Sequence, residues 1–341
     1  MQCPVEFCDI SRALKPLRAE IVKALDRVIE RHWFLRGPET KAFEEEWADY
    51  CGQAHCVACN SGTDALTLAA KALDLREAEI QSNTLALTAI GLQQGGARIK
   101  LLDIGEDGRL QQVTTAMVPV LLYGRIPNNT EIQARLFDAA HAHGWKPPQH
   151  AVACWSFYPT KSLGALGDGG AITTNDAGLA EVMVALSGRD DQFRDQRQIT
   201  SRMDELQAAI LRVKLRYLDR WLAERQNIAR EYNRQLAGIV SPTSQNKSDL
   251  HHLYVVRSQH RDALMRYLNA KGIQTKIHWT EPLHRMRAEW SKDVGSFPQA
   301  EAWSSSVLSL PCYPGLTENE VTTICNLIGE FSTTSNATNA D

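Results

Sequence analysis

The chain has 341 residues, of which 43% are hydrophobic and 23% are charged, and its formal net charge is -3. This mixture is typical of a soluble enzyme with one large and one smaller domain. The weak negative charge without a basic run argues against a nucleic-acid partner, and no apolar run approaches the length of a membrane span. Because the first residues lack the pattern of a signal peptide, we expect a cytoplasmic protein.

A first helix is predicted over residues 14–33, with apolar residues at Leu17, Ile21, Leu25 and Ile29 on one face. A turn over residues 34–38 follows. Further helices are predicted over residues 39–51, 65–73 and 85–94.

Three of the eight cysteines, Cys51, Cys56 and Cys59, have the spacing of plant-type iron–sulfur ligands. Cys56 and Cys59, however, fall in an apolar run that reads as a buried strand, and their spacing places them on opposite faces of it. Buried free cysteine commonly behaves as a small hydrophobic residue. We therefore expect neither a metal site nor, in a reducing compartment, disulfides.

Seven short apolar runs are interpreted as strands. They cover residues 55–59, 79–84, 97–104, 117–123, 134–140, 151–157 and 171–175. Helical patterns separate several of these strands. The sequence therefore predicts an α/β fold in which a mostly parallel seven-stranded sheet is covered by helices on both faces, as a three-layer sandwich.

The last third of the chain begins with a long helical pattern over residues 201–236, where Ser201 and Asp204 fit a capping box. This helix is long enough to bridge two domains. A smaller αβ region follows, with strands over 252–257 and 273–279, a helix over 261–270, and a last helix over 317–331 that opens with a second capping box. We expect a large domain at 10–236, a small domain at 237–331 and a disordered tail at 332–341.

One lysine stands just past the end of a strand, in the stretch Tyr158-Pro159-Thr160-Lys161. Four glycines follow within nine residues, at positions 164, 167, 169 and 170. Among apolar and glycine residues the ammonium form is disfavoured, and a neutral amine is what carbonyl addition requires. Taken alone, the stretch fits a surface lysine on a glycine-rich loop equally well.

Two further strand ends carry polar residues. Ser61-Gly62-Thr63 opens a helix, where free backbone N–H groups suit a phosphate, although a plain helix cap explains the serine as well. Asp138 ends an apolar strand and needs a cationic partner, either a protein side chain or a pyridinium nitrogen. Ligands of such sheets bind at the carboxyl ends of the strands, so we expect these residues to meet Lys161 there.

Together, these residues resemble the sugar aminotransferase family, a group of fold-type I pyridoxal-phosphate enzymes of the DegT/StrS type that act on nucleotide-linked keto sugars. The resemblance covers roughly residues 10–330. It rests on the segments 60–66, 138–140, 156–161 with the following Gly-Asp-Gly-Gly, 201–209 and 282–284.

The resemblance implies a role for each motif. Lys161 would bind pyridoxal 5'-phosphate covalently and move a proton between substrate and cofactor, and Asp138 would pair with the pyridinium nitrogen. Gly62, Thr63 and Ser156 would hold the cofactor phosphate. L-Glutamate would leave the cofactor as pyridoxamine 5'-phosphate, and a dTDP- or UDP-linked keto-deoxysugar would then accept the amino group, in polysaccharide or antibiotic biosynthesis. The segment 211–215 looks more like the branch that acts at C3 than at C4.

Further residues are assigned by the same resemblance. The segment 200–202, with Thr200 and Arg202, would reach the neighbouring subunit, which implies a homodimer with active sites at the interface. Phe34, His278 and His284 would contact the substrate.

Three positions depart from the family pattern. Leu85 stands where an aromatic residue usually stacks on the cofactor ring, His141 where a glutamine is often found, and Thr200 where an asparagine is usual. Two alternatives therefore stay open: a pyridoxal-phosphate keto-sugar dehydratase, although its relatives replace the lysine by histidine, and a non-catalytic binding or regulatory relative. A nicotinamide dehydrogenase is disfavoured because no G-x-G-x-x-G turn follows residues 55–59.

Overall fold

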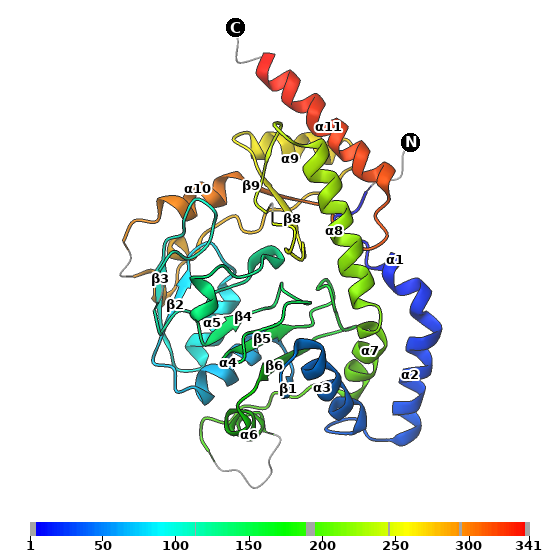
Figure 1. Cartoon of the computed structure of the whole chain (residues 1–341), viewed down its shortest axis with the longest axis vertical. Coiled ribbons are helices and arrows are strands. Elements are labelled where there is room, and N and C mark those ends of the chain that lie inside the picture. The colour runs from blue at the N-terminus through cyan, green and yellow to red at the C-terminus, as the bar shows by residue number, and fades with distance from the viewer. Residues whose placement is uncertain (1–4, 113, 189–194, 245, 293–294, 338–341) are drawn as a thin grey trace.

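Two groups of strands form the centre of the larger part of the chain in the structure, a computed structural model that describes residues 5–337 except 113, 189–194, 245 and 293–294 (Figure 1). The first group has the order β1-β6-β5-β4, and the second pairs β2 with β3 in parallel. The strands are β1 (His55–Cys59), β2 (Glu77–Gln81), β3 (Arg98–Leu102), β4 (Leu136–Asp138), β5 (Val152–Ser156) and β6 (Gly170–Thr174). β4 and β5 are parallel, whereas β6 is antiparallel to both of its neighbours.

The predicted strand over residues 117–123 is wrong. This segment makes only isolated parallel bridges, from Met117 to Glu79 and from Val120 to Asp138, and then turns in a short 3-10 helix. The left-handed backbone of Tyr123, with φ of 64°, is incompatible with a continuing strand. The bridges still connect β2 to β4 in one layer, but a seven-stranded sheet is not confirmed.

Helices cover the sheet on both faces, which confirms the three-layer α/β architecture. On one face lie α4 (Gly62–Ala72), α5 (Ala86–Gln94) and α6 (Ala177–Leu186), the last of which the sequence analysis missed; on the other lie α3 (Pro38–Cys51) and α7 (Glu205–Leu215). Cys59 packs on the α4 side and Cys56 on the α3 side, as their spacing predicted. Within the described ranges, no group of three or more His, Cys, Asp or Glu side chains is arranged to hold a metal ion.

The first predicted helix is divided in three. It consists of α1 (Ser11–Leu14), a 3-10 turn (Lys15–Leu17) and α2 (Arg18–Arg31), because Pro16 lacks the N–H that a continuous helix needs. Leu17 and Ile21 are buried as expected, but Ile29 is 53% exposed.

The long helix predicted over residues 201–236 is also divided, into α7 and α8 (Leu218–Gln235). The Ser201 capping box is wrong, because α7 begins at Glu205 and the Ser201 hydroxyl instead donates to Asp64 Oδ2 at 2.6 Å. α8 runs from beside the larger sheet to the smaller part of the chain (Figure 1). Leu222 near its start packs in the core of the larger sheet, and Tyr232 near its end packs in a second core. That this helix bridges two domains stays a prediction.

That second core belongs to a smaller part of the chain with an antiparallel sheet. The sheet has the order β7-β8-β9, formed by β7 (Ser241–Pro242), β8 (Tyr254–Arg257) and β9 (Val307–Leu310), and α9 (Arg261–Ala270) and α11 (Glu318–Ala337) pack beside it. The sequence analysis missed β7, β9 and α10 (Pro298–Ser306). The strand predicted over 273–279 is wrong. This segment makes only isolated bridges, one from Ile273 to Val5 and one from Lys276 to Ser309. The domain boundary after residue 236 stays a prediction.

The last helix begins as predicted. Glu320 N donates to Thr317 Oγ1 at 3.3 Å, and Thr317 N donates to the Glu320 carboxylate at 2.8 Å. The helix continues to Ala337, so its predicted end at Phe331 is wrong, and residues 332–337 of the expected disordered tail are helical. Residues 338–341 lie outside the described part.

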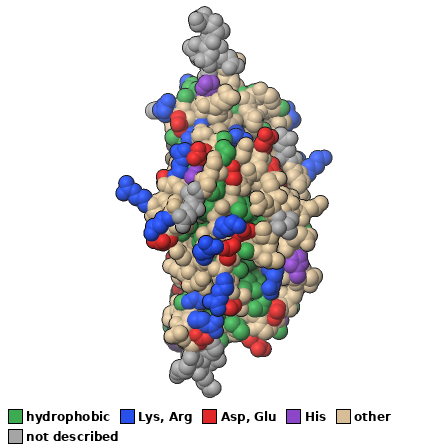
Figure 2. All heavy atoms as spheres, turned by 90° about the vertical axis from the view of Figure 1, so that its left-hand side faces the viewer, with side chains coloured by type: hydrophobic (Ala, Val, Ile, Leu, Met, Phe, Trp, Pro, Cys, Tyr) green, Lys and Arg blue, Asp and Glu red, His purple; other side chains and the backbone are tan. Residues whose placement is uncertain are grey.

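One face of the molecule shows how its charged side chains are distributed. Basic and acidic side chains are interspersed on the face shown in Figure 2. No helix in the part of the chain that the structure describes has both the length and the apolar character to cross a bilayer.

Candidate active site

A cavity of about 620 Å³ lies where the carboxyl ends of β4 and β5 face the smaller part of the chain. Eight of the twelve residues assigned from the sequence line it: Gly62, Thr63, Leu85, Asp138, His141, Ser156, Lys161 and His278. Residues far apart in the chain therefore meet at the sheet edge where the α/β pattern placed them.

Lys161 lies in the loop that joins β5 to β6. Two bonds close this loop on itself, from Phe157 N to Gly169 O and from Ala165 N to Phe157 O, both at 2.7 Å. A Cβ at Gly164 would lie 2.4 Å from the carbonyl oxygen of Pro159, so only glycine fits there. The ammonium group of Lys214 donates to the carbonyl of Gly164 from behind. The lysine is thus presented from a tightly folded loop.

Burial lowers the pKa of Lys161 to about 8, and the negative charge of Asp138 opposes this shift. Near pH 8, a substantial fraction of the molecules therefore carries Lys161 as a neutral amine. Burial also lowers the pKa of Lys214 to about 8. Lys214 is only 5% exposed, however, and does not line the cavity.

Asp138 is the last residue of β4 and is 6% exposed. Its Oδ2 accepts a hydrogen bond from the hydroxyl of Thr88 at 2.7 Å, and its Oδ1 accepts one from Ala140 N at 3.1 Å. Burial raises the pKa of the carboxyl group, and these two bonds and the charge of Lys161 oppose the rise. Among the described residues Asp138 has no ion pair within 4 Å, so a cationic ligand in the cavity would be its partner.

The start of α4 forms a second polar corner of the cavity. Ser61 caps the helix, since its Oγ accepts from Asp64 N at 3.1 Å, and the N–H groups of Gly62 and Thr63 precede the first intrahelical bond. A Cβ at Gly62 would lie 2.7 Å from Cβ of Ser156. The missing side chain leaves backbone N–H groups at the cavity, which suits an anion such as a phosphate.

His141 and Leu85, two of the residues that depart from the family pattern, line the cavity. His141 Nδ1 accepts a hydrogen bond from Tyr123 N at 3.2 Å. Burial holds the pKa of this imidazole well below its ordinary value, and the charge of Lys161 contributes. The ring is therefore neutral at neutral pH.

The sequence analysis missed several lining residues that come from the smaller part of the chain and from the N-terminal segment. They include Phe7, Cys8, His252, Lys276 and Trp279. Phe7 reaches the cavity because Val5 N donates to Gly272 O at 2.9 Å, a long-range contact without a local signal. Thr88 is a further omission, and its hydroxyl in the first turn of α5 was the only available signal.

Four assigned residues do not line this cavity: Phe34, Thr200, Arg202 and His284. Both ring nitrogens of His284 are engaged elsewhere, Nδ1 with Ser82 Oγ at 2.7 Å and Nε2 with Glu301 Oε1 at 3.1 Å. Phe34 is 48% exposed, and its carbonyl accepts from Glu205 N at 3.0 Å. Thr200 and Arg202 lie in the segment that precedes α7.

Comparisons with known proteins show the family of the chain. Residues 15–329 match the DegT/DnrJ/EryC1/StrS aminotransferase family. The chain is 38% identical to the erythromycin biosynthesis sensory transduction protein EryC1 of Saccharopolyspora erythraea, over 92% of this chain and 95% of that protein. It is 34% identical to the dTDP-3-amino-3,4,6-trideoxy-alpha-D-glucose transaminase of Streptomyces venezuelae, over 96% of each.

A solved structure of S. venezuelae DesV in complex with a ketimine intermediate superposes with a TM-score of 0.91 at 33% identity, covering 97% of this chain and 99% of that one. The fold, the cavity and the match over nearly the whole length lead to one assignment. The chain belongs to the DegT/DnrJ/EryC1/StrS aminotransferase family.

Proposed function

We propose that the protein is a pyridoxal-phosphate-dependent transaminase that moves the amino group of L-glutamate to a nucleotide-linked keto-deoxysugar. The observation that carries this proposal is the meeting of Lys161, Asp138 and the start of α4 in one cavity. The amine, the carboxylate and the anion-binding helix end match three polar groups of pyridoxal phosphate: the aldehyde, the ring nitrogen and the phosphate.

The residues present fit this cofactor. Gly62 and Thr63 would receive the phosphate on their N–H groups, beside the hydroxyl of Ser156. The hydroxyl of Thr84 lines the cavity and is buried without a hydrogen-bond partner among the described residues, so it offers a further polar contact. Asp138, whose carboxylate has no ion pair among the described residues, would hold the pyridinium nitrogen, and Leu85 offers an apolar surface to the ring.

Each side chain then has a task in the reaction. Lys161 would hold the cofactor covalently and, once released as a neutral amine, would take the proton from the substrate carbon and deliver it to the cofactor. Asp138 would keep a proton on the ring nitrogen, while Thr88 and Ala140 fix the carboxylate in place. Pyridoxal phosphate, when bound there, supplies the electron sink that stabilises the charge left on the substrate carbon.

A dTDP- or UDP-linked sugar with a keto group at C3 is the acceptor we favour. The support comes from the relative whose name specifies a dTDP-3-amino sugar, and from the sequence over 211–215. A role in deoxyaminosugar biosynthesis for an antibiotic or a polysaccharide follows from this choice of acceptor.

A homodimer with active sites at the interface is part of the proposal. Three consecutive apolar residues, Trp33, Phe34 and Leu35, are 56%, 48% and 39% exposed. Leu35 bridges to Asp204, which places this apolar patch beside the segment with Thr200 and Arg202. A second subunit packed on the patch would bury it. The segment with Thr200 and Arg202 would then lie near the cavity of that second subunit.

A non-catalytic regulatory role is the second candidate. It is favoured by one observation, the name of the 38% identical relative, which describes a sensory transduction protein. The keto-sugar dehydratase is disfavoured because position 161 is lysine.

The visible absorption spectrum of purified protein with added pyridoxal phosphate tests the proposal. We expect a yellow band that bleaches when excess L-glutamate is added, and amino-sugar formation when a dTDP-linked 3-keto sugar follows. Lys161→Ala should show no such band and should lose activity about 1,000-fold or more. Lys214→Met is the matched control, since it removes a lysine of similar pKa outside the cavity, and it should keep the band. A band that ignores glutamate would point to the regulatory candidate.

A further inference from the structure

His252 lies in the part of the cavity wall that the smaller part of the chain contributes, two residues before β8. It is 5% exposed and lines the same cavity as Asp138 and Lys161. Its ring lies against that of His141, with the ring centres 4.4 Å apart. A buried imidazole in the same cavity as a buried amine is a candidate for contact with a ligand.

The backbone at His252 is held in a strained path. The preceding residue, His251, has a left-handed backbone with φ of 46°, which is uncommon outside glycine. Leu250 N donates to Gly124 O at 2.8 Å, and a Cβ at Gly124 would lie 2.9 Å from the nitrogen of His252. Such strain persists only where the surroundings fix it, and it is common at functional sites.

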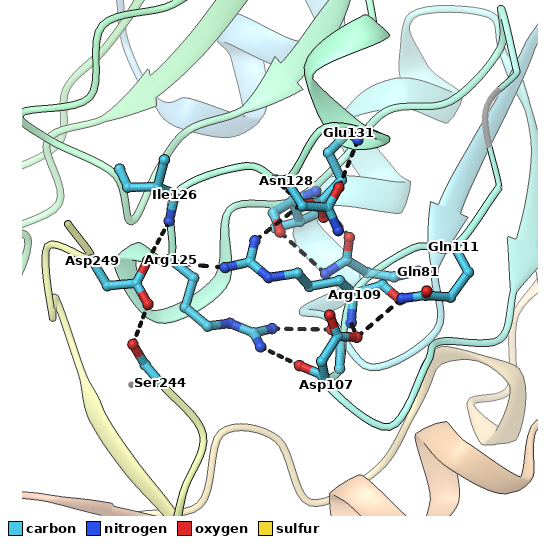
Figure 3. Close-up of polar contacts among 12 residues, drawn as sticks. Gln81, Asp107, Arg109, Gln111, Arg125, Ile126, Asn128, Glu131, Ser244 and Asp249 are labelled. Carbon is cyan, nitrogen blue, oxygen red and sulfur yellow. Dashed lines mark hydrogen bonds and ion pairs between the residues drawn. The ribbon is translucent and has the colours of Figure 1, made fainter. Parts of the chain in front are cut away.

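Further bonds fix the same segment on either side. Asp249 Oδ1 accepts from Ile126 N at 2.8 Å, and Figure 3 shows Asp249 joining Ile126 to Ser244. Arg225 Nη1 donates to the carbonyl of His252 at 2.9 Å. The backbone position of His252 is therefore fixed by several independent contacts.

The two ring nitrogens of His252 differ in their surroundings. Nδ1 is buried and has no hydrogen-bond partner among the described residues. A buried N–H without an acceptor is rarer than a buried lone pair without a donor, so the proton of the neutral ring belongs on Nε2. His141 has the same tautomer for a different reason, because its Nδ1 accepts the N–H of Tyr123.

Both rings are neutral at neutral pH. Burial lowers the pKa of His252 well below its ordinary value, and the nearby His141 and Lys161 add to the effect. The pair therefore offers two uncharged N–H donors and no charge that would repel the neighbouring amine.

We propose that His252 is a binding residue of the active site, which donates a hydrogen bond from Nε2 to an oxygen atom of the bound cofactor or substrate. This inference rests on the proposed function for the identity of the occupant. An oxygen of the cofactor and an oxygen of the substrate would both be partly negative acceptors. Removing the His252 donor distinguishes them, because either cofactor binding or substrate binding becomes weaker.

Two substitutions test which nitrogen acts. Glutamine places its amide nitrogen near the position of Nε2, whereas asparagine reaches only to that of Nδ1. We expect His252→Asn to weaken binding about ten-fold and His252→Gln to stay within about three-fold of the wild type. Melting temperatures of both variants without cofactor separate this effect from a loss of folding, since a purely structural role would not distinguish the two amides.

The binding constant for pyridoxal phosphate and the KM values for L-glutamate and the keto sugar identify the acceptor. A weaker cofactor constant in His252→Asn assigns the bond to a cofactor oxygen; unchanged cofactor binding with a raised KM assigns it to a substrate. Unchanged values for all three ligands would overturn the proposal. A wild type that binds no pyridoxal phosphate would instead overturn the proposed function.

Two controls complete the test. His143→Asn removes another buried imidazole, whose Nε2 lacks a partner among the described residues and which does not line the cavity. The asparagine oxygen can still accept the hydrogen bond that Leu163 N donates to Nδ1 at 3.2 Å, so the constants should stay within about two-fold of the wild type. Nitrogen-15 NMR of histidine-labelled protein without cofactor should show the proton of His252 on Nε2 at pH 7. A proton on Nδ1 contradicts the proposal whether or not the enzyme is active.

Discussion

The cavity has a floor and a wall of different origin. The floor belongs to the large part of the chain and consists of Gly62, Thr63, Asp138, Ser156 and Lys161; the wall consists of Phe7, His252, Lys276, His278 and Trp279. Every floor residue lies at or after the end of a strand or at the start of a helix. The sequence pattern of these elements is therefore enough to predict its place in the site. Most of the wall has no such pattern, because it is assembled by pairing between distant segments, such as Val5 with Ile273.

The difference suggests a division of labour. The floor holds the residues that we propose bind pyridoxal phosphate, whereas the wall faces the remaining space, where a substrate would lie. Changes in the floor should therefore reduce turnover, and changes in the wall should alter the apparent affinity for substrate. The following predictions test this division.

Asp138→Asn should have the largest effect among these. Asparagine keeps the shape and can still contact Thr88 and Ala140, but it no longer holds a proton on the ring nitrogen. We expect turnover to fall about 100-fold with little change in KM, measured under saturating glutamate. A raised KM with normal turnover would show that Asp138 acts on substrate affinity, as predicted for the wall, and would contradict the division between floor and wall.

The pH dependence of cofactor capture is the next largest effect. With a pKa of about 8, roughly 1% of the Lys161 side chains are neutral at pH 6 and about half at pH 8. The rate at which cofactor-free protein develops its visible band should rise roughly 50-fold over this range and then level off. A rate that still rises steeply above pH 9 would show an ordinary, solvated lysine.

Lys276→Gln tests the wall. The Lys276 ammonium lies 5.2 Å from the ring centre of Phe7 and lines the cavity, where it can attract the diphosphate of a nucleotide sugar. We expect KM for the nucleotide sugar to rise about five-fold with turnover nearly unchanged. Lys271→Gln is the matched control: Lys271 lies over Tyr267 in a similar way, away from the cavity, and its loss should change neither value.

Thr88→Val should have the smallest effect. It removes the hydroxyl that donates to Asp138 Oδ2 and keeps the side-chain volume. The free energy of unfolding should fall by about 1–2 kcal/mol in urea denaturation, and turnover by less than ten-fold. A loss as large as that of Asp138→Asn would mean that Thr88 itself contacts the cofactor.

The same contrast explains how far the sequence predicted the fold. Alternation along β1 placed Cys56 and Cys59 on opposite faces, because the pattern of a strand depends only on neighbouring residues. The segment 117–123 looked equally strand-like, but the left-handed turn at Tyr123 depends on contacts with the distant residues 250 and 253. Local composition does not contain that information. The contacts of His284 could not be predicted for a related reason, since its partners Ser82 and Glu301 are remote in the chain, and its role toward the substrate stays a prediction.

The two buried lysines near the loop after β5 have a practical consequence for covalent labelling. Lys161 and Lys214 have similar pKa values of about 8, so an aldehyde or active-ester reagent at that pH meets comparable amounts of neutral amine on each. Lys161 opens on a cavity, whereas Lys214 rests against the carbonyl of Gly164 and is only 5% exposed. Selectivity between the two is therefore a matter of access rather than basicity. A small reagent that resembles the cofactor should mark Lys161 and leave Lys214 untouched.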